Sequence, residues 1–285
     1  MKLIVLIAVS LFPIASARAQ NITAAEVIAR IRKEYPVEAQ PNGVDTFKAG
    51  DSTARVTGIS VTMMATLDVL QRAAKQGDNL IITHEPTFYS HRDTALLFEK
   101  ENDAVFAAKQ KFINDHGLII WRFHDAPHLV SPDVIKAAVA RTLGWSAYAS
   151  KEDPSIYVLP RTSLRDLAVN AARKLDAGAL RISGDGSAII SKVVMKEGFS
   201  GFPAIRRLIQ KANPDVVVFG EDHEWEAVEY VVDAISEGRI KGLVVLGHIP
   251  SEQSGMKDVS ERLRALIPGV PVHFTPTKDP FRPVR

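Results

Sequence analysis

The segment Asn79-Leu80-Ile81-Ile82-Thr83-His84-Glu85 places a short apolar run directly before a histidine and a glutamate. A short run of this kind, bounded by polar residues, predicts a buried β-strand. The same arrangement recurs where residues 118–123 precede His124-Asp125, and two later runs end in Glu221 and in His248. Because ligands bind beyond the carboxyl ends of the strands in open α/β sheets, these side chains predict a polar site.

Apolar runs alternate with amphipathic helical windows along the rest of the chain, as in an α/β protein with a mostly parallel sheet. The pattern lapses around residues 145–155, so we expect two α/β lobes, over residues 20–148 and 149–285. Mixed, mostly parallel sheets are expected in both lobes, with a metal site between them. Helices are expected over residues 22–35, 66–75, 102–116, 131–143, 164–175, 203–212, 224–236 and 251–267, and Ser131-Pro132 is expected to open the fourth of them.

The composition excludes several classes of protein. The chain has 285 residues, 24% of them charged and 46% hydrophobic, which excludes a disordered chain and a collagen-like fibre. It has no cysteine, which excludes disulfide scaffolds, thiolate metal sites and cysteine nucleophiles. A formal net charge of +2 argues against a nucleic-acid-binding protein.

The N-terminus has the features of a secretory signal peptide. Lys2 precedes an apolar run over residues 3–15, and Ala17-Arg18-Ala19 forms a small-residue cleavage site. We therefore expect residues 1–19 to be removed and the mature protein to be secreted or periplasmic. No later segment has the length and apolarity of a membrane span.

Imidazole and carboxylate groups dominate the predicted site, and these are ligands that zinc, manganese or iron accept. They are too many for one closed tetrahedral site, so we expect two divalent ions sharing a bridging water. The candidate residues are His84, Glu85, His124, Asp125, His128, Glu221, His248 and Glu252.

Each candidate also has a simpler structural explanation. A single histidine at a strand end is commonly just a hydrogen-bonded residue, and Asp125 fits a turn before Pro127. Glu252 fits the third position of a helix that begins at Pro250. Glu221 could equally be a metal ligand or accept a hydrogen bond from a residue that is one. The glycine-containing turn at residues 197–201 fits either an anion site or a tight connection between strand and helix.

Taken together, these segments resemble a family of dinuclear-metal proteins known as GTP cyclohydrolase I type 2, or NGG-interacting-factor-like (NIF-like), over nearly all of the mature chain. LIITHEPTFY resembles the family's I-x-x-H-H-P-[LF]-[FW] signature, with Glu85 in place of its second histidine. FHDAPHLVSPD resembles the H-x-x-x-D segment, with His128 in place of its aspartate. The remaining similar segments are GISVTMMATLDVL at 58–70, VVMKEGFSGF at 193–202, VVFGEDHEWEAV at 217–228 and LGHIPSEQSG at 246–255.

The two departures exchange one imidazole and one carboxylate between the two positions, so the numbers of histidine and carboxylate ligands stay the same. The resemblance implies His84, Glu85, His128, His248 and Glu252 as metal ligands. His124 matches the leading histidine of its segment, and Asp125 is an alternative ligand in the same loop. The family also implies a two-lobed α/β protomer that assembles into a ring-shaped hexamer.

Two functions follow as hypotheses. In the first, the protein is a metal-dependent hydrolase, in which His124 or Glu221 moves the proton of an activated water. The family label suggests opening of the purine ring of GTP, but an exported enzyme meets little GTP. Another small molecule with a C–N, amide or phosphate bond is therefore the expected substrate.

In the second, the protein binds metal without catalysis, for structure or regulation, through closed coordination shells. A cleft with further polar groups at the metal site would favour an enzyme. A third hypothesis, an extracellular binding lobe without metal, predicts that a chelator leaves thermal stability unchanged.

Overall fold

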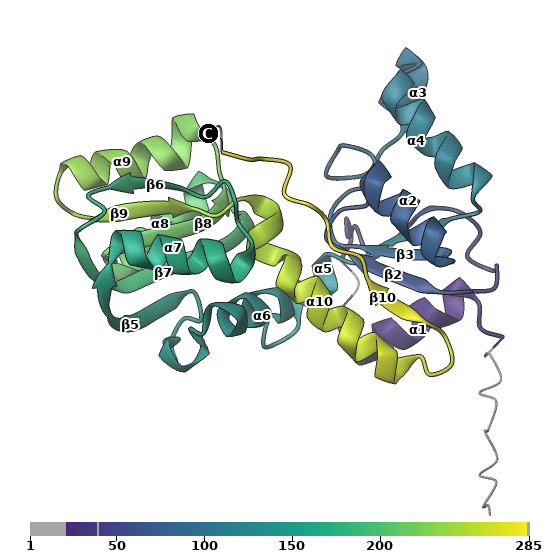
Figure 1. Ribbon diagram of the computed structural model, residues 1–285, viewed down its shortest axis with the longest axis horizontal. Helices are drawn as coiled ribbons and strands as arrows, with labels where there is room; N and C mark the ends of the chain where they lie inside the picture. The colour runs from purple at the N-terminus through teal and green to yellow at the C-terminus, as the bar shows by residue number, and fades with distance from the viewer. Residues whose placement is uncertain (1–20, 39, 284–285) are drawn as a thin grey trace, which may run out of the picture.

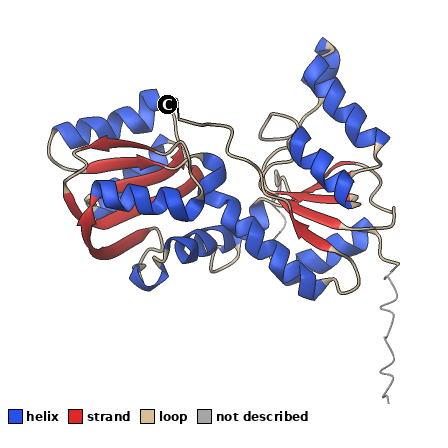
Figure 2. Ribbon diagram, in the orientation of Figure 1, coloured by secondary structure: helices blue, strands red, loops and turns tan. Residues whose placement is uncertain are grey.

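The computed structural model describes residues 21–38 and 40–283, which form two β-sheets covered by helices (Figures 1 and 2). The predicted signal peptide at residues 1–19 lies outside the described residues. Within the described ranges, no helix is both long enough and apolar enough to cross a bilayer.

The first sheet contains the strand that precedes His84. Its strands are β1 (Phe47–Ala49), β4 (Ile119–Arg122), β3 (Leu80–Thr83), β2 (Ile59–Thr62) and β10 (Val272–Phe274), in that spatial order. All neighbours pair in parallel except β1 and β4, which are antiparallel. Every residue of β2, β3 and β4 is buried, as expected for short apolar strands covered on both faces.

Helices cover both faces of this sheet. Leu80 and Ile82 pack in the core that α1 and α10 share, whereas Ile81 packs in the core of α2 and α4 on the opposite face. This split follows from the two-residue period of a strand. The helices of this part are α1 (Ala24–Glu34), α2 (Leu67–Gln76), α3 (Leu96–Glu101), α4 (Ala104–Asp115) and α5 (Asp125–Leu129).

The second sheet has the same layered construction. Its strands are β5 (Ile156–Ser163), β7 (Ile189–Phe199), β8 (Val216–Glu221), β9 (Gly242–Val245) and β6 (Arg181–Gly184), in that spatial order. β7, β8 and β9 are parallel, and the two edge strands are antiparallel to their neighbours. The predicted α/β fold with two mixed sheets is confirmed.

Helices also cover both faces of the second sheet. One apolar core joins α6 and α7 to it, and a separate core on the other face joins α8 and α9. The elements are α6 (Val134–Leu143), the 3-10 turn η1 (Ser146–Tyr148), α7 (Leu164–Leu175), α8 (Phe202–Ala212), the π-helix η2 (Glu224–Val228) and α9 (Glu229–Ser236).

Helix α10 (His248–Leu266) connects the two sheets. It contacts β7 and β8 of the second sheet and β2 and β10 of the first, and it runs between them in Figure 1. Its 19 residues give it a length of about 28 Å, enough to return the chain to the first sheet. After residue 149, strands β5 to β9 lie in the second sheet, but β10 pairs with β2 and so returns to the first sheet.

Two helices begin three residues away from their expected starts. α6 begins after Asp133, whose carboxylate accepts a hydrogen bond from the Lys136 amide at 2.9 Å, and not at Ser131-Pro132. α10 begins at His248, three residues earlier than expected, because Gly247 makes the turn into the helix with φ 92°. Consequently Glu252 lies one full turn after His248, on the same face of the helix.

Candidate metal centre

Six of the predicted side chains lie together where the first sheet meets α10. Two follow β3, one follows β4, one lies in the last turn of the short helix α5, and two lie on the first turns of α10. Segments far apart in sequence therefore supply one cluster. The six residues, called the His/Glu cluster below, are His84, Glu85, His124, His128, His248 and Glu252.

Asp45 positions the short helix that carries His128. Its carboxylate accepts hydrogen bonds from the amides of His124 (2.6 Å), Asp125 (2.8 Å) and Ala126 (2.9 Å). These amides are the donors that a helix N-terminus leaves without partners. Asp45 thereby fixes the start of α5 at the end of β4.

Each imidazole of the cluster is anchored through Nδ1, which leaves its Nε2 atom facing the centre. This is the arrangement in which histidines ligate metals, because a partner on one nitrogen fixes the tautomer and orients the other. The four Nδ1 contacts are His84 with the Phe123 carbonyl (3.1 Å), His124 with Asp125 (3.0 Å), His128 with Asp133 (3.0 Å) and His248 with Glu221 (3.0 Å).

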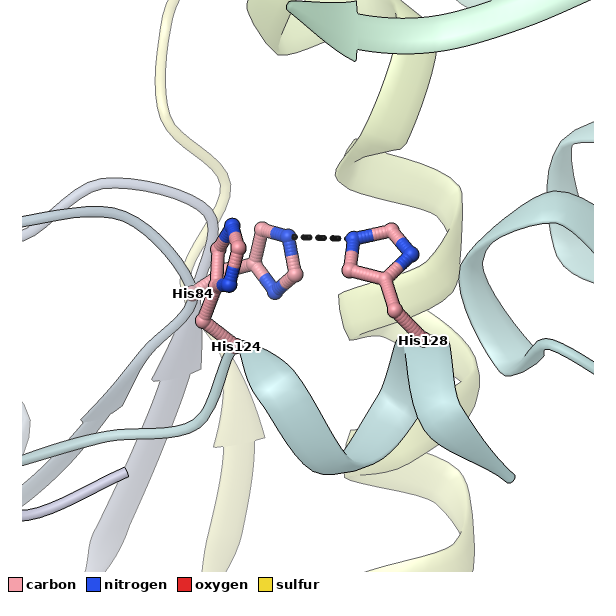
Figure 3. A group of neighbouring side chains, drawn as sticks. All are labelled: His84, His124 and His128. Carbon is pink, nitrogen blue, oxygen red and sulfur yellow. Dashed lines mark hydrogen bonds between the residues drawn. The ribbon is translucent and has the colours of Figure 1, made fainter. Parts of the chain in front are cut away.

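The Nε2 atoms and carboxylates converge. The Nε2 atoms of His84 and His128 lie 3.3 Å apart, as the dashed line in Figure 3 shows. The ring of His124 stacks on that of His84, with centroids 4.7 Å apart. Oε1 of Glu85 lies 3.2 Å from Nε2 of His248 and 3.6 Å from Nε2 of His124. Two sets of three, His84 with His124 and His128 and His84 with Glu85 and Glu252, are compact enough to surround an ion.

The cluster also contains a buried oxygen atom that lacks a hydrogen bond. Oε2 of Glu252 lies 3.1 Å from Nε2 of His248 and 3.7 Å from Nε2 of His84, yet it has no hydrogen-bond partner. Glu252 is only 4% exposed. A buried carboxylate oxygen without a partner is costly unless a cation or another group satisfies it.

Arg122 holds Glu85 and the backbone of His84 in place. It is fully buried; its guanidinium contacts Oε2 of Glu85 at 3.3 Å and donates to the backbone carbonyls of His84 and His91. One oxygen of Glu85 is therefore held by this arginine, while Oε1 faces the histidines.

The surroundings shift the pKa values of these groups in opposite directions. Burial lowers the pKa of His84 to about 4, so its imidazole is neutral near pH 7 and its Nε2 carries a lone pair. Burial opposes the charged form of His248 too, but the neighbouring carboxylates of Glu221, Glu252 and Glu85 raise its pKa well above the usual value. Burial acts against ionised Glu85, but His248 and His84 hold the pKa of that carboxyl below its usual range.

Two predicted site residues lie outside the cluster. Asp125 bonds to Nδ1 of His124 and to the Val44 amide, so it orients a histidine. Glu221 likewise bonds to Nδ1 of His248, and its side chain is 53% exposed. Sequence reasoning missed Asp45, Asp133 and Arg122; only Asp133 carried a signal, as an aspartate at a helix start.

The glycine-containing segment 197–201, at the end of β7, packs directly on the cluster. A Cβ on Gly198 would lie 2.3 Å from Oε1 of Glu252, and the Gly198 amide donates to the Ser251 hydroxyl. The amide is thus used inside the protein. This favours the interpretation of residues 197–201 as a tight connection.

Two cavities border the cluster. One of about 520 Å³ is lined by Glu221, His248 and the C-terminal segment 279–281. The other, of about 570 Å³, is lined by Glu85, His248 and residues of the loop after β3. Both volumes suit a small molecule.

One family model matches nearly all of the described chain. The family model described as Duf34/NIF3 (NGG1p interacting factor 3) matches residues 22–280. The chain belongs to the DUF34/NIF3 family. The resemblance found in the sequence motifs is thereby confirmed.

Solved structures share the fold of this NIF3 family chain. A Bacillus cereus protein related to NIF3 is 16% identical, with a TM-score of 0.72 over 93% of this chain and 100% of that one. The Staphylococcus aureus protein SA1388 is 18% identical, with a TM-score of 0.71 and the same coverage. Reduced HcgD from Methanocaldococcus jannaschii is 16% identical, with a TM-score of 0.64 over 90% and 99% of the two chains. No curated protein was found to match this chain.

Proposed function

We propose that this NIF3 family protein is a metal-dependent hydrolase that holds two divalent ions in the His/Glu cluster. The observation that carries the proposal is the set of four anchored imidazoles whose Nε2 atoms face two buried glutamates. Zinc, manganese and iron all accept this donor set.

The residues fit such ions. Oε2 of Glu252 is buried without a hydrogen bond, and neutral His84 presents a lone pair toward it. His84 would belong to both sets of ligands, with His128 and His124 in one and with Glu85 and Glu252 in the other. His248 lies beside both glutamates of the second set. His124, expected from its sequence position as a proton shuttle, is in this proposal a ligand, because its Nε2 faces Glu85 at 3.6 Å.

Bound divalent ions would lower the pKa of a coordinated water toward about 7, which supplies a nucleophile at neutral pH. Glu221 is then the group that accepts the proton, because its carboxylate is half exposed and lines the 520 Å³ cavity beside His248. The substrate would be a small molecule with a C–N, amide or phosphate bond. The adjoining cavities favour an enzyme over the alternative of a non-catalytic metal-binding or regulatory protein, which needs no open position.

Metal analysis tests the site. Purified protein is expected to contain two ions per chain by inductively coupled plasma mass spectrometry, and His84→Ala and His248→Ala are expected to lower this content sharply. His116→Ala is the matched control, because His116 is an exposed histidine at the end of α4. Unchanged metal content in both cluster variants would overturn the site.

An activity screen tests the reaction. The metal-loaded protein is assayed against nucleotides, phosphoesters and cyclic amides, beside Glu221→Gln and the control Glu224→Gln, which changes a neighbouring exposed glutamate. Because Glu221 also holds Nδ1 of His248, Glu221→Gln is expected to bind metal more weakly, so it is assayed with excess metal. We expect it to lose activity even when the site is loaded. Equal activity of both variants on a hydrolysed substrate would contradict the role of Glu221.

We also propose export and assembly into a hexamer, on the basis of the N-terminal signal sequence and of the family resemblance. Cell fractionation of the full chain and of a variant without residues 1–19 tests export. Light scattering of the purified protein tests the hexamer; a monomeric mass would contradict it.

A further inference from the structure

A buried ammonium group lies in the 570 Å³ cavity beside the cluster. Lys109, on α4, is only 4% exposed and lines this cavity together with Glu85 and His248. Its Nζ donates to the Thr87 carbonyl at 2.5 Å and lies 5.0 Å from the centre of the Tyr89 ring. None of the residues proposed as ligands contacts it.

No carboxylate in the described part of the chain lies within 4.0 Å of this ammonium. The acidic group that influences it is Asp93, but that carboxylate accepts a hydrogen bond from the Phe88 amide and lies 4.0 Å from Nζ of Lys48. Burial lowers the pKa of Lys109 to about 8, so the amine is still mostly charged near pH 7. A buried charge without a counterion is costly, and a ligand anion would offset that cost.

A second unsatisfied donor lies in the same cavity. The hydroxyl of Thr87 is buried and has no hydrogen-bond partner. The ammonium of Lys109 has three N–H groups and the Thr87 carbonyl takes one of them. Both side chains therefore retain hydrogen-bonding capacity that the protein itself does not use.

The loop that carries Thr87 has a strained backbone. Tyr89 adopts φ 57°, a left-handed conformation that a residue with a Cβ rarely takes. Its ring is half exposed and lies over Lys109 at the edge of the cavity. The strain is thus located where the loop forms the wall of the cavity.

We propose that Lys109 and the Thr87 hydroxyl bind an oxyanion, a phosphate or carboxylate group of the substrate, while the bond to be cleaved lies at the Glu85 and His248 end of the same cavity. The location of the cleaved bond rests on the proposed hydrolase function. The substrate class is then a small anionic molecule, and the cavity volume admits one of metabolite size.

Binding of simple anions tests the proposal. Calorimetric titration of the full protein with sodium sulfate, as a phosphate mimic, and with sodium acetate is compared for the parent, Lys109→Met and Lys111→Met. Lys111 is the matched control, because it is an exposed lysine on α4 that pairs with Asp115. Each titration is repeated after removal of metal with a chelator, which separates this site from direct binding to the ions.

We expect Lys109→Met to weaken binding of the preferred anion at least about tenfold, as loss of a charge-assisted hydrogen bond predicts, and Lys111→Met to leave it unchanged. The difference between sulfate and acetate identifies the phosphate or carboxylate class. Thermal melting of Lys109→Met is expected to be equal to or higher than that of the parent, because the variant removes a buried charge.

Equal anion affinity of the parent and Lys109→Met, or absence of binding by the parent, would overturn the proposal. A lower melting temperature of Lys109→Met with unchanged anion affinity would assign Lys109 a purely structural role. If the parent binds no metal but binds the anion through Lys109, the hydrolase function fails while the oxyanion site stands.

Discussion

At the scale of single residues, the site depends on the groups behind the histidines as much as on the histidines themselves. The candidate ligands were predictable because they follow apolar strands. Their partners were not, because the carbonyl of Phe123 has no sequence signature and Asp133 resembles an ordinary helix cap. Only the folded chain shows that Asp133 both caps α6, by accepting a hydrogen bond from the Lys136 amide at Oδ1, and orients His128 through Oδ2.

The substitution Asp133→Asn separates these two tasks. Asparagine caps helices as well as aspartate does, so α6 should retain its stability. The His128 ring loses its charged partner, and loss of such a partner lowers metal affinity about 10–100-fold. Competition with a chromogenic chelator measures this affinity.

Asp103→Asn is the control, because Asp103 caps α4 and contacts no histidine of the cluster. Equal metal affinity in Asp133→Asn and in the parent would show that His128 does not depend on this carboxylate.

At the scale of elements, the sequence predicted most strands and most helices well because apolar runs and caps are local signals, but it missed the three-residue edge strand β1. The helix that carries His128 was not predicted. α5 has only five residues, too few for a helix that is stable alone, and it is held by Asp45 from 79 or more positions earlier in the chain. A contact over such a separation leaves no periodic pattern.

Asp45→Ala should loosen α5. Three amides lose their acceptor, so we expect a loss of about 2 kcal/mol in the free energy of unfolding, measured by urea denaturation without metal. Because His128 moves with α5, metal affinity should fall as well. The control Asp51→Ala removes an exposed turn contact with Thr53 and should change neither quantity. Normal metal affinity in Asp45→Ala would argue against α5 as a ligand-bearing element.

At the scale of the whole molecule, the cluster joins parts of the chain that are far apart in sequence. α10 starts beside the second sheet, supplies His248 and Glu252, and packs along the first sheet before β10 joins it. The strands before residue 149 and the strands β5 to β9 lie in different sheets. The return of the chain through α10 was not predictable, since β10 has the same local pattern in either sheet. Ions bound in the cluster would therefore tie the start of α10 to the ends of β3 and β4.

Removal of metal should consequently destabilise the whole fold. A ligand present at about 1,000 times its dissociation constant stabilises a protein by about 4 kcal/mol, and 1 kcal/mol shifts the melting temperature by about 2–4 °C at this chain length. We expect a chelator to lower the melting temperature of the parent by about 10 °C in scanning calorimetry, and re-addition of the ion to restore it. His84→Ala, which lacks a ligand of both sets, should melt at the same low temperature with and without chelator. If the chelator leaves the melting temperature of the parent unchanged, the result favours the third hypothesis, a binding lobe without metal. Loss of ions that link α10 to two strand ends would lower the stability of the fold.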